Sequence, residues 1–239
     1  MPDLNLPNHI AIIPDGNRRW AKKKKFQPWI GYQKGAESFE GVLERILELK
    51  IPYTTFWGGS WDNLTKRPKI EIKFLIASYK SQFERMIKDK RIHKNQVRIN
   101  ALGRWREILP KTTQQAIEGA IEVTKNYNQN FFTFFLAYDG TDEMIDCIKK
   151  IVKQNNPHQK TEINYKTIKE NLWTKNLPPV DLVIRTGCQG DPHLSAGFMM
   201  WDTAYSQLYF TETLFPDFGP KDLDKALADY AKRQRRFGK

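Results

Sequence analysis

The sequence contains few cysteines and no grouping of metal-binding side chains. Its 239 residues include two cysteines, Cys147 and Cys188, which provide neither a disulfide framework nor the paired spacing of a zinc site. The four histidines are scattered along the chain: His9, His93, His158 and His193. This pattern excludes a disulfide-stapled secreted protein and favours a cytoplasmic location, where thiols stay reduced.

The chain also lacks a long apolar run. No stretch approaches the roughly 20 apolar residues that a membrane-spanning helix needs. The first residues, MPDLNLPNH, have no basic-then-apolar leader pattern. We therefore expect a soluble protein. A peripheral contact with a membrane surface stays open as an alternative.

Nucleotide-binding motifs and nucleic-acid signatures are absent as well. Neither GxxxxGK(S/T) nor GxGxxG occurs. Aromatic residues make up 13% of the chain, yet they do not alternate with basic residues as in platforms that stack single strands. The basic runs KKKK (22–25) and KRQRR (232–236) are more typical of solvated helix faces. We expect no nucleic-acid partner.

What the sequence does contain is an excess of positive charge. Lysines and arginines number 39 against 27 aspartates and glutamates, which gives a formal net charge of +12. Such an excess indicates an anionic partner: nucleic acid, an anionic membrane face or a phosphorylated substrate. The charge alone does not choose among them.

Apolar periodicity predicts strands that alternate with helices. We expect strands at 9–14, 51–57, 96–103, 131–138, 180–186 and 206–211. We expect helices at 35–50, 68–89, 110–127, 141–154, 164–174 and at the basic C-terminal end, with a polar surface loop at 154–160. This alternation implies right-handed crossovers and a mainly parallel α/β sheet. The simplest organisation is a single domain over 1–239.

Polar motifs follow four of the expected strands: DGNRRW, GGSWDN, DGTDE and RTGCQGDPH. Ligands of such sheets bind at the carboxyl ends of the strands, so these motifs are expected to share one site. In the first motif, Gly16 allows close approach to an anion, and Arg18 and Arg19 add forked donors for diphosphate oxygens. Asp15 beside them could hold Mg²⁺ bridged to diphosphate. The alternative is an Asp-Gly turn with solvated arginines.

Further polar residues follow the second and fifth expected strands. After the second strand come Ser60, Asp62, Asn63, Arg67 and Glu71. These residues fit either a binding site or a loop with a helix cap. Arg185 ends the apolar strand VIR; a guanidinium there needs an anionic ligand or an internal ion pair.

Together these stretches resemble one family, the cis-prenyltransferases, typified by undecaprenyl diphosphate synthase. The matching stretches are HIAIIPDGNRRWAKK, SWDNLTKRP, VDLVIRT, AYSQLYFTETLFPDF and the closing RRFG, in the family's order from about residue 8 to 238. The resemblance implies a parallel six-stranded sheet flanked by helices, a hydrophobic tunnel and a homodimer. It also implies Mg²⁺-assisted loss of diphosphate from an allylic donor, attack by the double bond of isopentenyl diphosphate, and proton loss to a Z double bond.

The resemblance assigns roles to individual residues. Asp15 matches the metal-linked aspartate. The diphosphate loop and its neighbour match at Gly16, Asn17, Arg18, Arg19 and Trp20. Ser60 and Asn63 match residues of proton transfer and diphosphate handling, and Asp62 lies between them in the same motif. Other substrate-site positions fall on Arg67, Glu71, Arg185 and Ser195.

The sequence departs from the family's pattern mainly on the isopentenyl diphosphate side. His193 stands where the family carries a second arginine, and Gln207 stands where a glutamate helps to bind Mg²⁺. Tyr32 replaces a usual histidine and Pro28 a frequent arginine. A neutral amide is a weaker Mg²⁺ ligand than a carboxylate, so Gln207 is a doubtful metal ligand.

These departures leave three functions open. The first is a regular chain-elongating enzyme with an adapted second site. The second, which we favour, is a short-product or irregular enzyme, such as those that join two five-carbon allylic diphosphates head-to-middle into lavandulyl-type skeletons. The third is a non-catalytic partner subunit or prenyl diphosphate carrier, against which the intact Asp15 and Asn63 argue.

The strand FFTFFLAY bears on product size. It carries Phe131, Phe132, Phe134 and Phe135, where relatives often have smaller side chains. Because side chains alternate across a strand, about half of these rings are expected to face the tunnel. Rings in a packed interior would shorten it and limit products to around C10 to C15. The alternative is that all four pack against covering helices and leave the tunnel open.

Overall fold

The structure is a computed structural model that describes residues 5–154 and 162–233. The expected polar loop at 154–160, beyond its first residue, lies outside the described residues. So do His158, the closing RRFG stretch and the end of the KRQRR run.

Six parallel strands form one sheet in the order β3-β4-β2-β1-β5-β6. Their bounds are β1 His9–Ile13, β2 Tyr53–Gly59, β3 Val97–Leu102, β4 Asn130–Leu136, β5 Leu182–Arg185 and β6 Gln207–Phe210. All five residues of β1 are buried, as expected for a central strand covered on both faces. The predicted α/β class and the six-stranded parallel sheet are confirmed.

The helices connect the strands as crossovers. They are α1 Asn17–Lys23, α2 Pro28–Glu48, α3 Trp61–Thr65, α4 Lys69–Lys88, α5 Lys90–Lys94, α6 Trp105–Ile108, α7 Lys111–Thr124, α8 Gly140–Gln154, α9 Tyr165–Asn171 and α10 Pro220–Lys232. Two short 3₁₀ turns follow β5 and β6, η1 Ser195–Gly197 and η2 Phe215–Asp217. The helix expected at 35–50 starts earlier, at Pro28, because proline suits a helix's first turn.

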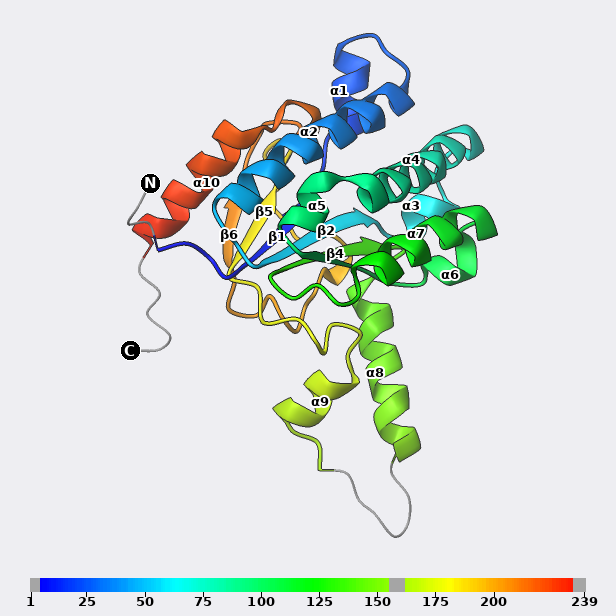
Figure 1. The fold of residues 1–239 in the computed structure, drawn as a ribbon, viewed down its shortest axis with the longest axis vertical. Coiled ribbons are helices and arrows are strands. Elements are labelled where there is room, and N and C mark those ends of the chain that lie inside the picture. The colour runs from blue at the N-terminus through cyan, green and yellow to red at the C-terminus, as the bar shows by residue number, and fades with distance from the viewer. Residues whose placement is uncertain (1–4, 155–161, 234–239) are drawn as a thin grey trace.

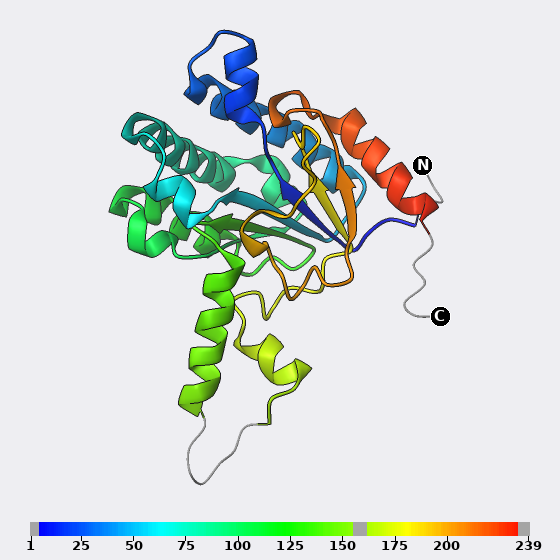
Figure 2. The same ribbon diagram turned by 180° about the vertical axis from the view of Figure 1, so that it is seen from behind.

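The two faces of the sheet are covered differently. Helices α2, α4, α7 and α10 pack on one face and form the larger core with it (Figure 1). On the other face, irregular chain around Leu177 and Phe198 packs on β1, β4 and β5, as seen from behind in Figure 2. Helix α8 extends away from the sheet with α9 at its side. In the described part of the chain, no helix is long and apolar enough to cross a bilayer.

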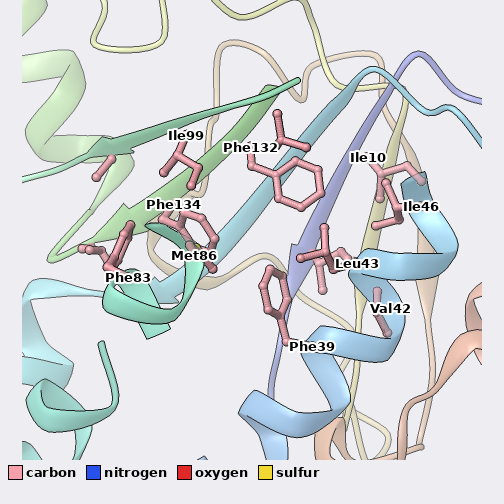
Figure 3. Close-up of a cluster of buried hydrophobic side chains, with 14 of the residues drawn as sticks. Ile10, Phe39, Val42, Leu43, Ile46, Phe83, Met86, Ile99, Phe132 and Phe134 are labelled. Carbon is pink, nitrogen blue, oxygen red and sulfur yellow. The ribbon is translucent and has the colours of Figure 1, made fainter. Parts of the chain in front are cut away.

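Strand β4 divides its four phenylalanines between these faces. Phe132 and Phe134 belong to the core under α2 and α4, where Figure 3 shows them with Phe39, Phe83 and other apolar side chains. Phe135 packs on Tyr138 and Phe198 on the opposite face. Phe131 stacks on Tyr53 with ring centres 4.7 Å apart. Two of the four rings therefore lie on each face of the sheet, as expected from the alternation of side chains along a strand.

Candidate active site

The turn after β1 brings Asp15 and Gly16 to the carboxyl edge of the sheet. Gly16 has φ 106°, a left-handed conformation that favours glycine. A Cβ atom there would lie 2.6 Å from Cδ2 of Leu214, so the position also lacks room for a side chain. The glycine thus allows the chain to turn from the strand directly into α1, which carries Arg18 and Arg19.

Asp15 lies between two guanidinium groups. Its Oδ1 accepts hydrogen bonds from the backbone N–H of Gly16 at 2.6 Å and pairs with Arg19 Nη2 at 3.0 Å. Its Oδ2 accepts from Arg185 Nη2 at 2.8 Å. The Asp15 side chain is 37% exposed, whereas that of Arg185 is 6% exposed. A buried arginine and an accessible one therefore hold a carboxylate at the sheet edge.

Arg185 also organises the loop after β5. Its Nη1 donates to Ser195 Oγ and to the backbone carbonyl of His193, both at 2.7 Å. Its Nε–H is buried without a hydrogen-bond partner. The internal ion pair that we considered for Arg185 exists, with Asp15 as its partner.

A second polar cluster includes Arg18, Tyr32 and Arg67, which line the cavity. Arg18 Nε pairs at 3.1 Å with the buried Glu71 of α4. Glu71 also accepts from the Tyr32 hydroxyl at 3.3 Å, and that hydroxyl accepts from Arg67 Nη1 at 2.8 Å. Burial, opposed by Arg67, raises the pKa of Tyr32, which keeps the phenol protonated. Arg18, Glu71, Tyr32 and Arg67 thus form one hydrogen-bonded network.

Helix α3 places Asn63 at the cavity. Ser60 is its N-cap and accepts from the Asn63 backbone N–H at 3.2 Å, while the Asp139 carboxylate accepts from the Trp61 N–H at 3.0 Å. Ser60 is buried, so the structure supports the helix-cap alternative for this residue. Asn63 itself lines the cavity.

The side chains of four predicted residues lie outside this site. Asp62 points outward and pairs with Lys66. Trp20 of α1 is buried, and its indole N–H donates to Asp217. The His193 imidazole turns away toward the Asp191 carboxylate, and only the carbonyl of His193 reaches Arg185.

Gln207 is the fourth of these residues. It begins β6 and pairs in register with Leu182, three residues before Arg185. At about 3.3 Å per residue, Gln207 lies about 10 Å along the strands from the edge that carries Asp15. Its side-chain carbonyl accepts from Arg233. The expectation that Gln207 joins Asp15 at a metal is therefore corrected within this chain.

An apolar cavity of about 380 Å³ descends from this polar mouth between α2, α4, β2 and β4. The predicted residues that line its mouth are Asp15, Gly16, Asn17, Arg18, Arg19, Tyr32, Asn63 and Arg67. Its interior is lined by Phe39, Phe56, Leu75, Phe83, Met86, Phe134, Leu136 and Phe215. Apart from Phe134, we did not assign these interior residues to a cavity from the sequence.

Phe134 lies among three other rings of this cavity. Its ring centre is 5.1 Å from that of Phe83 and 5.7 Å from that of Phe39, both in edge contact. Phe39 in turn contacts Phe56 at 4.6 Å. Figure 3 shows Phe39 extending from α2 toward the sheet, with Phe83 of α4 beside Phe134. These rings close the cavity at the sheet.

The donor set at the mouth suits one mode of metal binding. In the described ranges, no three histidine, cysteine or acidic side chains converge on a common point. Mg²⁺, however, is commonly held by one or two carboxylates together with substrate phosphates and water. Asp15, accessible and beside arginines that would bind phosphate, fits that mode.

Arginines above an apolar cavity define an enzyme site for a substrate with an anionic head and an apolar tail. The family described as putative undecaprenyl diphosphate synthase matches residues 13–238. The chain is 38% identical over 236 residues to the tritrans,polycis-undecaprenyl-diphosphate synthase (geranylgeranyl-diphosphate specific) of Pyrococcus furiosus, covering 98% of this chain and 88% of that one. It is 36% identical over 235 residues to an isoprenyl transferase of Thermotoga maritima, covering 98% of both.

Solved structures agree with these sequence matches. Lavandulyl diphosphate synthase from Lavandula x intermedia, in complex with dimethylallyl diphosphate, superposes with a TM-score of 0.86 at 30% identity, covering 98% of this chain and 99% of that one. A probable undecaprenyl diphosphate synthase from Campylobacter jejuni gives 0.77 at 26% identity, with full coverage of both. The chain belongs to the undecaprenyl diphosphate synthase family of cis-prenyltransferases and is a prenyl-transferring enzyme.

Proposed function

We propose that the protein condenses an allylic diphosphate with isopentenyl diphosphate, or with a second five-carbon allylic diphosphate, and releases diphosphate and a short product. The observation that carries this proposal is the arginine-rich mouth above a cavity closed by aromatic rings. Arg18, Arg19 and Arg67 would bind the donor diphosphate, with Asn17 beside them. Arg185 and Ser195 would bind the acceptor diphosphate.

In the reaction, the C1–O bond of the donor breaks and its electron pair leaves with diphosphate. The acceptor's double bond supplies the electrons of the new carbon–carbon bond, and the acceptor then loses a proton. A divalent metal, which we propose is Mg²⁺ held by Asp15 and the donor diphosphate, would neutralise the leaving group's charge. Asn63 would orient the acceptor.

The size of the cavity supports a short product. A water molecule occupies about 30 Å³, and a hydrocarbon carbon is of similar size, so a five-carbon unit needs roughly 150 Å³. The cavity of about 380 Å³, which includes the polar mouth, is of the order of a few such units. This agrees with a product of around C10 to C15.

A long-chain product is the second candidate, because the names of curated relatives specify undecaprenyl diphosphate. Eleven units at roughly 150 Å³ each would exceed the cavity several-fold. Incubation with Mg²⁺ and dimethylallyl diphosphate, with and without isopentenyl diphosphate, followed by dephosphorylation and mass spectrometry, distinguishes the candidates. C10 to C15 alcohols support the proposal, and chains of C50 or longer would refute the short product while leaving prenyl transfer intact.

The acceptor site distinguishes regular from irregular coupling in the same experiment. Of the residues that we propose for the acceptor diphosphate, Arg185 and Ser195, only Arg185 carries a positive charge. His193 contributes its backbone carbonyl rather than a positive side chain. A product formed from dimethylallyl diphosphate alone would show head-to-middle coupling. A product that requires isopentenyl diphosphate would show regular elongation.

We also propose that the enzyme is a homodimer joined through α8. Ile145, Ile148 and Val152 lie on one face of this helix, and each is half exposed or more. Figures 1 and 2 both show α8 extending beyond the sheet, where a second copy can cover that face. Light scattering of Ile148→Lys/Val152→Lys is expected to give a monomer where the wild type gives a dimer.

The cytoplasmic location and a peripheral membrane contact belong to the same proposal. Both cysteines are free and buried, which suits a reducing compartment. The net charge of +12 favours an anionic surface as a partner in addition to the diphosphate substrates.

A further inference from the structure

One end of the molecule carries a group of exposed lysines. Lys22–Lys25 end α1 and form the turn into α2, and Lys69 and Lys73 lie on the first turns of α4. Both views place the α1–α2 turn and the start of α4 toward the same end of the molecule (Figures 1 and 2). None of these six lysines forms an ion pair with any residue that the structure describes.

Apolar side chains are exposed among these lysines. Phe26 is 52% exposed, Ile70 51% and Phe74 39%. Trp29, at the start of α2, stacks on Phe74 of α4, with ring centres 4.6 Å apart and planes 14° from parallel. The stack joins the two helix ends. We call these residues the lysine–aromatic rim: Lys22–Lys25, Phe26, Trp29, Lys69, Ile70, Lys73 and Phe74.

The carboxylates of the neighbouring elements are already engaged. Glu71, next to Ile70 in sequence, is buried and paired with Arg18. Glu37 of α2 pairs with Lys34, and Asp62 of α3 pairs with Lys66. The lysines of the rim therefore keep their positive charge uncompensated at the surface.

A hollow between α2 and α4 lies beside the rim. Its volume is about 280 Å³, and Trp29 and Phe74 form part of its lining. It shares Tyr32, Ala36, Ser78 and Gln82 with the wall of the main cavity. The rim thus borders a hollow that is separated from the apolar cavity by a single layer of side chains.

We propose that the lysine–aromatic rim docks on the surface of an anionic lipid bilayer. Lysines near such a surface are attracted by its negative potential, and aromatic and aliphatic side chains among them enter the headgroup boundary. Nucleic acid is the less suitable partner, because Trp29 and Phe74 occupy each other's faces and cannot both stack on bases. Docking would bring the hollow between α2 and α4 next to the lipid, where apolar tails enter or leave. This consequence for tails, unlike the docking itself, rests on the proposed function.

Flotation of the purified protein with vesicles tests the proposal. Vesicles of phosphatidylcholine alone are compared with vesicles that contain one fifth phosphatidylserine. The wild type is expected to bind only the anionic vesicles, and to release them as salt is raised. Since each lysine near an anionic surface contributes about fivefold to binding, the variant K22Q/K23Q/K24Q/K25Q is expected to bind at least 100-fold more weakly. F26S/I70S, both exposed, is expected to lose binding as well.

A charge-matched control lies at the C-terminal ends of α2 and α4 and on the adjoining short helix α5. K50Q/K88Q/K90Q/K94Q removes four exposed lysines there and is expected to bind vesicles within threefold of the wild type. Equal loss in both quadruple variants would overturn the proposal, as would wild-type binding by the rim variant. Rim-dependent binding of a single-stranded oligonucleotide without vesicle binding would also overturn it. Prenyl transfer from five-carbon substrates, measured without vesicles, should be unchanged in every variant, which separates failure of this proposal from failure of the proposed function.

Discussion

Removal of the Phe134 ring is expected to lengthen the product by one five-carbon unit. Phe134→Ala deletes six carbon atoms from the floor of the cavity, which is about the size of one prenyl unit. The neighbouring rings of Phe39 and Phe83 contact Phe134 through their edges and come from α2 and α4 rather than from β4, so they do not refill the space at once. A tail that stops at C10 in the wild type would then reach C15.

The same substitution has a cost in stability that the assay must separate from the effect on length. Phe→Ala in a core costs about 3–5 kcal/mol. Phe135→Ala is the matched control: it is the next residue of β4, equally buried, and packs on the opposite face against Tyr138 and Phe198. The control should be destabilised to a similar degree, yet its product should be unchanged.

Products are compared by mass spectrometry of the dephosphorylated alcohols, with dimethylallyl and isopentenyl diphosphate as substrates. Urea unfolding of both variants confirms that each is folded at the assay temperature. Phe132→Ala, which lies deeper in the core and does not line the cavity, is expected to leave length unchanged. An equal shift in Phe135→Ala, or no shift in a folded Phe134→Ala, would refute the reasoning.

Three further predictions concern the metal site and the core. Asp15→Ala is expected to abolish turnover while circular dichroism stays that of the wild type, because Asp15 is a partly exposed site residue rather than a core residue; activity within threefold of the wild type would contradict its role. Gln207→Glu is expected to leave the Mg²⁺ concentration at half-maximal activity within twofold, since Gln207 contacts Arg233 and not Asp15; a large decrease would show that this position reaches the metal. Burial lowers the pKa of His9 to about 4 from 6.5, so the unfolded chain binds the proton first. The contribution of His9 to the free energy of unfolding is therefore complete above pH 6.5 and is lost as the pH falls toward 4, by up to about 3 kcal/mol. Urea unfolding over this range should show a weaker pH dependence for His9→Gln than for the wild type.

The sequence alone determined much of the fold and the nature of the ligand. Strands and helices alternate with apolar spacing, which fixes a parallel α/β sheet because crossovers of that kind are right-handed. Polar motifs follow the strands, and so their meeting at one edge follows from strand direction alone. The turn at Asp15 and Gly16 and the arginines after it could also be predicted from the sequence, because one short stretch of chain contains them all.

Tertiary structure decided which distant residues meet. Arg185 reaches Asp15 across 170 residues because β5 pairs directly with β1, a neighbour relation that no local pattern encodes. Gln207 was considered as a metal ligand through the resemblance alone; the pairing of β6 with β5 places it at the start of its strand, away from the edge that carries Asp15. Likewise, alternation along β4 predicted that half of the rings face each way. Which half faces the cavity depended on the face that α2 and α4 cover, and packing between remote segments chose that face.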